Sequence, residues 1–109
     1  MSDPDAAAGG AGPAAGDASA MALRRTVRIT NSRGLHARAA AKLVAVAERF
    51  SSSVNVSRDG ETVPACSIMG LMMLGAGVGS EITIDADGWD AKEALEAVAG
   101  LVEAGFHED

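Results

Sequence analysis

The sequence predicts an α+β domain in which three helices cover one face of a four-stranded antiparallel sheet. The order of the predicted elements is strand, helix, strand, strand, helix, strand, helix, which is typical of such a layered fold. Apolar residues alternate in the strand segments and recur every three to four positions in the helical ones. The length of 109 residues is typical of a single domain.

We expect residues 1–21 to form a disordered tail and residues 22–109 to form the folded domain. The tail consists almost entirely of Ala, Gly, Asp, Ser and Pro. Such a segment buries too little apolar surface to offset the entropy lost on ordering. It carries three aspartates, no Lys or Arg and no continuous apolar run, so we do not expect a secretory signal peptide.

The first strand and the first helix are predicted in the basic part of the chain. Val27 and Ile29 alternate with polar residues, which predicts a strand over residues 24–30. A loop over residues 31–34 follows, and a helix is expected to begin at residue 36 or 37 and end at residue 50. Its core-facing residues lie at helical spacing: Ala40, Leu43, Val44, Ala47 and Phe50.

The second half of the domain alternates between strands and helices. Asp59-Gly60 is a strong hairpin sequence, Ser67 is placed to cap a short apolar helix, and Asp90 is placed to cap the last one. The elements are strands 54–57, 62–65 and 81–85, a helix over 67–74, and a final helix with Ala91, Ala94, Leu95, Val98, Leu101 and Val102 on its core face.

The net charge argues against a nucleic-acid binder, and the charge distribution leaves two interpretations open: the basic segment could meet an acidic partner or a phosphate, or its charges could simply be solvated. The net charge is −6, yet residues 24–49 hold seven of the nine basic residues. No apolar run approaches the length of a membrane span, so we expect no membrane association. Cys66 is the one cysteine, so no internal disulfide is possible and a reducing compartment, the cytoplasm, is expected.

Three further residues are interpreted as structural or inert. Cys66 is expected to be a partly buried filler, Trp89 to pack against the last helix, and His107 to be exposed in a frayed, acidic end of the chain. His36, Cys66 and His107 lack the spacing of metal ligands, so no metal site and no cofactor are expected.

His36 lies where the predicted loop becomes a helix, which is an electrostatically positive position. The first N–H groups of a helix have no partner within it and attract anions. Neutral imidazole is a nucleophile at physiological pH, and the guanidinium of Arg38 can donate two hydrogen bonds to phosphate oxygens. The residue types alone favour an exposed, idle histidine at a helix cap over a functional one.

Two segments resemble the HPr family, the histidine-containing phosphocarriers of the phosphoenolpyruvate-dependent phosphotransferase system of bacteria. Residues 31–38, Asn-Ser-Arg-Gly-Leu-His-Ala-Arg, resemble the active-site segment, and residues 67–72 resemble the regulatory serine site. The resemblance extends over about residues 24–108. It implies the open-faced β-sandwich of that family. It also implies that His36 accepts a phosphoryl group on Nδ1 from phosphorylated enzyme I and passes it to an enzyme IIA-type protein, assisted by Arg38.

The resemblance also implies regulation at Ser67, by phosphorylation from ATP through HPr kinase/phosphorylase. Ile68, Leu71 and Met72 on the following helix are expected to contribute to a docking patch, and partly to the core. The chain would then be a cytoplasmic phosphoryl carrier and a monomer, rather than a free-standing enzyme.

One residue departs from the family pattern. Proline usually follows the active-site arginine, whereas this chain has Ala39. Alanine suits a helix but leaves this position less rigid. Our hypothesis is therefore a nitrogen-related or regulatory branch of the system rather than sugar uptake.

Other classes of function are weaker alternatives. A regulatory protein could act mainly through Ser67 phosphorylation, with His36 vestigial, although His36 and Arg38 are both intact. A small-molecule-binding regulatory domain would need a ligand cleft, usually between two copies. A hydrolase would need a nucleophile elbow, an acid/base pair or a metal site, none of which the sequence contains.

Overall fold

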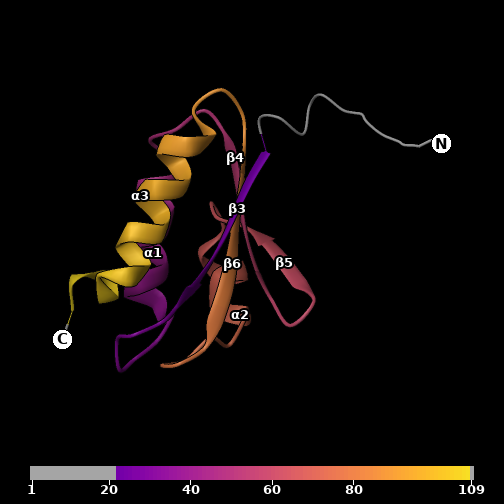
Figure 1. Cartoon of the computed structure of the whole chain (residues 1–109). Helices are drawn as coiled ribbons and strands as arrows, with labels where there is room; N and C mark the ends of the chain where they lie inside the picture. Colours follow the sequence, from indigo (N-terminus) through magenta and orange to yellow (C-terminus); the bar gives the residue numbers. More distant parts are fainter. Residues whose placement is uncertain (1–21, 109) are drawn as a thin grey trace.

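The computed structural model describes residues 22–108, so the tail predicted for residues 1–21 lies outside the described residues. A four-stranded antiparallel sheet runs through this domain in the order β3-β6-β4-β5 (Figure 1). The strands are β3 (Ala22–Arg28), β4 (Ser53–Arg58), β5 (Glu61–Pro64) and β6 (Glu81–Asp87). β4 and β5 form the hairpin predicted around Asp59-Gly60, and both of these residues have positive φ there.

Three α-helices accompany the sheet: α1 (Ala37–Ala47), α2 (Ile68–Met73) and α3 (Ala91–Glu103). In Figure 1, α1 and α3 lie along one face of the sheet, and α2 is seen in the lower part of the view, where β6 passes in front of it. A short 3-10 helix, η2 (Gly105–His107), follows α3. The predicted α+β architecture, an open-faced sheet with three helices in the order βαββαβα, is confirmed.

The core lies between the helices and the inner face of the sheet. Alternate residues of β6 point inward and are buried, as the period of a half-buried strand requires. The largest fully buried side chain of the described residues is Phe106 in η2, a residue outside the predicted core faces. The other large, fully buried apolar residues are Ile29, Leu43, Val56, Leu71, Ile82, Ile84, Val98 and Val102.

The opposite face of the sheet is polar. Hydroxyl groups pair across neighbouring strands: Thr26 lies 3.1 Å from Thr83, and Ser57 lies 2.8 Å from Thr62. Arg24 and Arg28 form ion pairs with acidic residues of β6 on this face. Because this face is polar, it can remain in contact with solvent, and helices cover only the other face of the sheet.

Several local predictions are wrong, beginning with the end of α1, Trp89 and Cys66. α1 ends at Ala47 rather than residue 50, because residues 48–50 form a turn. Trp89 is 76% exposed and does not pack on α3, and Cys66 is exposed rather than partly buried. Both side chains occupy loop positions, where sequence periodicity gives no information about burial.

Asp90 occupies the predicted N-cap position of α3, but its side chain does not cap the helix. Instead, its carboxylate accepts hydrogen bonds from the backbone N–H groups of Ser51 and Ser52, each at 2.9 Å, and from the Ser52 hydroxyl. Asp90 is buried. These hydrogen bonds connect the loop between α1 and β4 to the start of α3.

The segment after α3 is folded rather than frayed. Gly105, Phe106 and His107 all have φ between 57° and 64°, in the left-handed region that non-glycine residues rarely adopt. This turn directs Phe106 into the core and leaves His107 exposed, as predicted for that histidine. It also brings Glu108 back toward the start of α1.

Candidate functional site

His36 occupies the N-cap position of α1, with φ −77° and ψ 178°. The first hydrogen bond of the helix runs from the N–H of Ala40 to the carbonyl oxygen of His36, at 2.8 Å. The N–H groups of the three residues between them therefore have no acceptor within the helix. The imidazole side chain is 15% exposed, so the ring lies at the surface but is held by its surroundings.

The loop before His36 is held against the glycine-rich turn that precedes β6. The N–H of Leu35 donates to the carbonyl oxygen of Ala76 at 2.9 Å. Gly34 has φ +66°, and a Cβ at this position would lie 2.5 Å from the same oxygen. Glycine is required here both for its backbone conformation and for this close approach.

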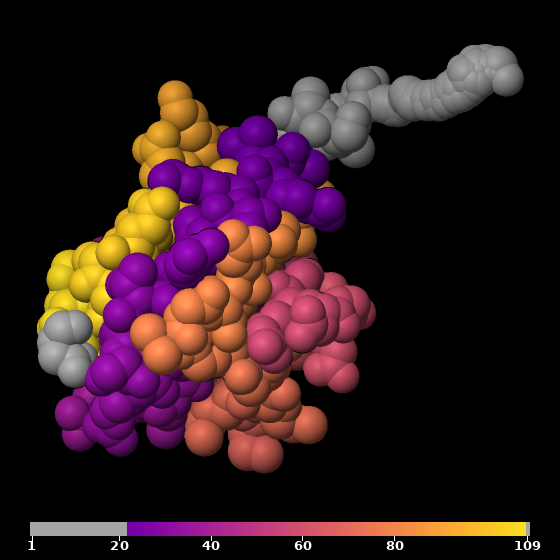
Figure 2. Space-filling view, turned by 60° about the horizontal axis from the view of Figure 1, so that its bottom comes forward, coloured from indigo at the N-terminus to yellow at the C-terminus, as the bar shows by residue number. Residues whose placement is uncertain are grey.

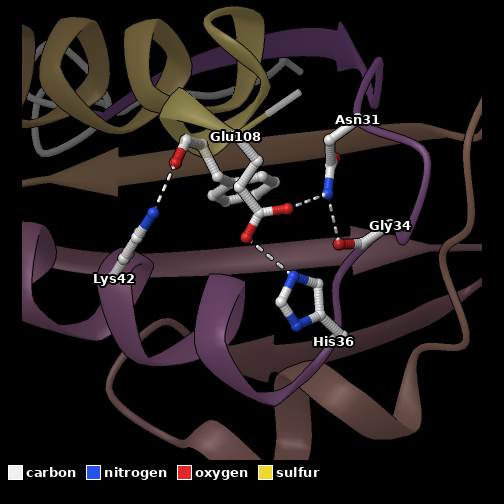
Figure 3. Close-up of polar contacts among 6 residues, drawn as sticks. Asn31, Gly34, His36, Lys42 and Glu108 are labelled. Carbon is white, nitrogen blue, oxygen red and sulfur yellow. Dashed lines mark hydrogen bonds and ion pairs between the residues drawn. The ribbon is translucent and has the colours of Figure 1, made fainter.

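The ring of His36 is hydrogen-bonded to the C-terminal segment. Its Nε2 lies 2.8 Å from Oε2 of Glu108, and the second ring nitrogen points away from this carboxylate (Figure 3). Among residues 22–108, Glu108 is the one hydrogen-bond partner of the imidazole. Nδ1 therefore has no hydrogen-bond partner among residues 22–108.

Asn31 holds the second oxygen of this carboxylate. Its Nδ2 donates to Oε1 of Glu108 at 3.1 Å and to the carbonyl oxygen of Gly34 at 2.8 Å (Figure 3). Asn31 is fully buried, and its Oδ1 has no hydrogen-bond partner among the described residues. One amide thus links the loop before the histidine to the segment after α3.

Electrostatics keep Glu108 ionised in this environment. Burial by itself would raise the pKa of Glu108, but hydrogen bonds from His36 and Asn31, with the charges of His36 and Lys42, lower that pKa below its ordinary value. The carboxylate is therefore a hydrogen-bond acceptor at neutral pH.

Arg38 lies on the exposed surface of the first turn of α1, close in sequence to the ring. It forms no hydrogen bond or ion pair with any of residues 22–108. Arg33 in the preceding loop is also exposed and without a partner among those residues. Two guanidinium groups therefore remain available for an anion that approaches His36 from solvent.

Ser67 is the N-cap of α2, as predicted, and its Oγ accepts a hydrogen bond from the N–H of Gly70 at 3.0 Å. Of the three expected docking residues, Ile68 and Met72 are exposed, but Leu71 is fully buried and belongs to the core. Leu71 is therefore not available to a partner. Met69 and Met73 are exposed as well, at 71% and 75%.

We call the exposed side chains of Ile68, Met69, Met72 and Met73 the α2 patch. α2 packs against α1, whose N-cap residue is His36. Figure 2 shows α2 at the bottom of the molecule, beside the purple surface of the first loop and α1. The yellow C-terminal segment lies on the other side of that purple surface. The patch and the histidine therefore lie at the same end of the molecule.

The sequence alone did not indicate the contacts that Asn31 and Glu108 make in the site. They lie 77 positions apart and meet only because η2 turns the chain back. Asn31 belongs to the quoted active-site segment, so its place in the sequence indicated the site but not its contact. Among residues 22–108 no cluster of His, Cys, Asp and Glu could hold a metal ion, and no helix is long and apolar enough to cross a membrane.

Comparisons with known proteins agree on one family. The model of the PTS HPr component phosphorylation site matches residues 23–104. Phosphocarrier protein HPr of Cupriavidus necator is 50% identical over 86 residues, which cover 79% of this chain and 97% of that protein. Phosphocarrier protein NPr of Shewanella violacea is 43% identical over 86 residues, 79% of this chain and 94% of that protein.

Solved structures give the same result for the fold. The crystal structure of HPr-C-His from Thermoanaerobacter tengcongensis superimposes with a TM-score of 0.76 at 42% sequence identity. The match covers 80% of this chain and 98% of the other.

Proposed function

Because the chain belongs to the HPr family of phosphocarrier proteins, we propose that it carries a phosphoryl group on Nδ1 of His36. The observation that supports this most directly is the ring geometry: Nε2 is hydrogen-bonded to Glu108, whereas Nδ1 has no partner among the described residues. The ring also lies at the N-terminus of α1, where the helix dipole stabilises negative charge.

The transfer requires a nucleophile and a place for the phosphoryl oxygens. The lone pair of Nδ1 attacks the phosphorus of phosphorylated enzyme I, and the bond from phosphorus to the donor group breaks with its electron pair returning to the donor. The free N–H groups of the first turn and the guanidinium of Arg38 would receive the phosphoryl oxygens. Arg38 is exposed and unpaired among residues 22–108, so it can turn toward the new anion.

The phosphoryl group then passes to an enzyme IIA-type protein. In this scheme the chain is a cytoplasmic, monomeric carrier that is regenerated by each transfer, rather than a free-standing enzyme. The α2 patch beside His36 supplies an apolar docking surface for both partners. Exposed methionines suit a surface that must fit more than one partner, because their side chains repack easily.

The experiment that tests the proposal is phosphoryl transfer from phosphoenolpyruvate through enzyme I, on the wild-type chain and on His36→Ala. Intact mass before and after acid treatment is the measurement, because a phosphohistidine is lost in acid. We expect one acid-labile phosphate on the wild type and none on the variant. A wild-type chain that stays unmodified with both sugar-type and nitrogen-type enzyme I would refute the proposal.

The same assay separates the two branches of the system. We propose the nitrogen-related or regulatory branch, on the basis of Ala39 in the position of the usual proline. Ala39 is fully buried in the first turn of α1, so it affects the rigidity of the helix start rather than a surface contact. Failure to accept phosphate from a nitrogen-type enzyme I, with transfer from the sugar-type enzyme, would refute this branch.

A second proposed function is regulation through Ser67, by HPr kinase/phosphorylase and ATP. Ser67 immediately precedes the α2 patch and is partly exposed. A phosphate there would add about −1.5 to −2 charges beside an apolar docking surface. Incubation with the kinase and ATP should add one acid-stable phosphate to the wild type and none to Ser67→Ala.

A further inference from the structure

We propose that Glu108 is a positioning residue for His36: its carboxylate, held by Asn31, keeps the ring proton on Nε2 and so leaves the Nδ1 lone pair free to attack. This inference rests on the proposed phosphoryl transfer and adds two residues to it. Neither residue contacts the phosphoryl group in this scheme, since both act through the imidazole.

The hydrogen bond between Glu108 and His36 fixes the tautomer. An ionised carboxylate only accepts hydrogen bonds, and neutral imidazole has one N–H. The contact between Oε2 and Nε2 at 2.8 Å therefore requires the proton on Nε2. Nδ1 is then deprotonated, which is the state a nucleophile needs.

Asn31 fixes the carboxylate in turn. Each oxygen of Glu108 has its own donor, Nε2 of His36 for one and Nδ2 of Asn31 for the other. A carboxylate held at both oxygens cannot rotate freely, so the direction of the hydrogen bond to the ring is fixed. Asn31 is fully buried and also bonded to the carbonyl oxygen of Gly34, so it is itself held in place.

The backbone after α3 brings Glu108 to the ring. Phe106 and His107 adopt positive φ, a conformation that persists only where surrounding contacts enforce it. Those contacts are the burial of the Phe106 side chain and a hydrogen bond from Nζ of Lys42 to the Phe106 carbonyl oxygen at 2.7 Å. Besides burying Phe106, the turn thus places a carboxylate on Nε2 of His36.

The same contact remains useful after transfer. When Nδ1 bonds to phosphorus, the ring becomes a cation that still carries its proton on Nε2. That N–H can continue to donate to Glu108, and the donation becomes charge-assisted on both sides. No proton has to enter or leave the ring during the step.

The test combines nitrogen NMR of the His36 ring with the rate of phosphorylation by phosphoenolpyruvate and enzyme I. The chain is labelled with ¹⁵N, and the tautomer is measured at a pH where the ring is neutral. We expect the Nε2–H tautomer in the wild type, and a mixture of tautomers in Glu108→Ala. Phosphorylation of Glu108→Ala should be slower by about five- to ten-fold.

Two matched variants separate positioning from a general loss of structure. Glu108→Gln can offer its one amide oxygen to Nε2–H, but its NH2 group then faces the donor Nδ2 of Asn31, so it should keep more of the Nε2–H tautomer and of the rate than Glu108→Ala does. Glu103→Ala removes a nearby glutamate that pairs with Arg25 and does not contact the site, so both measurements should be unchanged. Asn31→Ala should move the tautomer ratio in the same direction as Glu108→Ala.

Each failure has its own signature. A wild-type ring with its proton on Nδ1 would overturn the inference without any variant. Unchanged tautomer and rate in Glu108→Ala, with normal phosphorylation of the wild type, would overturn it while leaving the carrier function intact. Absence of wild-type phosphorylation, whatever the tautomer, would instead refute the proposed function.

Discussion

Lys42 in the middle of α1 is joined to Phe106, 64 positions later, through a hydrogen bond from its Nζ to the Phe106 carbonyl oxygen at 2.7 Å. The side chain of Phe106 is fully buried, whereas its backbone forms part of a left-handed turn. The lysine thus satisfies a carbonyl that the turn would otherwise leave without a charged donor. It ties the C-terminal segment to the helix that carries His36.

Removing this donor should loosen the C-terminal turn. Lys42→Met keeps most of the aliphatic stem but leaves the Phe106 carbonyl without its partner, which costs about 1–3 kcal/mol. Amide hydrogen exchange of residues 105–108 should accelerate, as measured by NMR. The same exchange rates in wild type and variant would show that the turn does not depend on the lysine.

Phe106→Ala should be among the most destabilising single substitutions in the domain. Truncating a fully buried phenylalanine costs about 3–5 kcal/mol, and alanine gives no relief of the positive φ. Urea unfolding measures the loss. Trp89→Ala is the control, because this large aromatic side chain is exposed and should change stability by less than about 0.5 kcal/mol. A larger effect at Trp89 than at Phe106 would contradict the assignment of the core.

Gly34→Ala should cost more than Gly75→Ala, although both glycines have φ near +65°. At Gly75 a Cβ meets nothing within 4 Å, so alanine costs about 1–2 kcal/mol for the left-handed conformation alone. At Gly34 a Cβ would also clash with the Ala76 carbonyl oxygen. We therefore expect Gly34→Ala to lower the free energy of unfolding by about 2–4 kcal/mol and to slow phosphorylation of His36. Equal unfolding midpoints for the two variants would argue against the close approach.

The contribution of Asp90 to stability should depend on pH. Hydrogen bonding to the Ser52 side chain, opposed by burial and aided by the backbone N–H groups of Ser51 and Ser52, lowers the pKa of Asp90. A lowered pKa in the folded state stabilises the protein above the unfolded value of about 3.9. That stability is lost as the pH falls through the folded pKa.

Asp90→Asn isolates this effect. The variant should be less stable than the wild type at pH 7, and the difference in urea midpoint should shrink as the pH approaches and passes below about 4. Glu61→Gln, an exposed change in the β4–β5 hairpin, is the control. A difference that stays constant from pH 7 to pH 3 would mean that the charge of Asp90 is not what holds the Ser52 loop.

Ser67→Ala and Ser67→Asp should separate capping from charge. Alanine removes the acceptor for the Gly70 N–H and costs about 1 kcal/mol of stability, but adds no charge to the α2 patch. Aspartate can still cap the helix, yet it should slow transfer from enzyme I because its charge lies beside the docking surface. Equal transfer rates for Ser67→Asp and the wild type would refute the regulatory proposal.

Local patterns predicted most of the fold. Alternation in the strands, helical spacing in α1 and α3, Asp59-Gly60 in the hairpin and Ser67 as a cap all have local causes. The exposure of Trp89 could not be predicted in this way, because a loop residue is buried only if some distant segment covers it.

The candidate site was predicted in part for the same reason. His36 is singled out by the resemblance of residues 31–38 to the HPr active-site segment, and its place at a helix start is a local feature. The contact between His36 and Glu108 joins residues 72 positions apart and depends on the left-handed turn of η2. No composition rule predicts positive φ at Phe106, since the conformation is enforced by packing and not by the residue type.

The opposite positions of Ala22 and Glu108, the first and last residues that the structure describes, have a practical consequence for engineering. A fusion partner or affinity tag on the carboxyl side of Glu108 follows a residue whose carboxylate contacts the ring of His36. One joined before Ala22 leaves from the far end of the sheet, where Ala22 pairs with Asp87 (Figure 1). Tags, labels and surface tethers for assays of this protein therefore belong at the amino end.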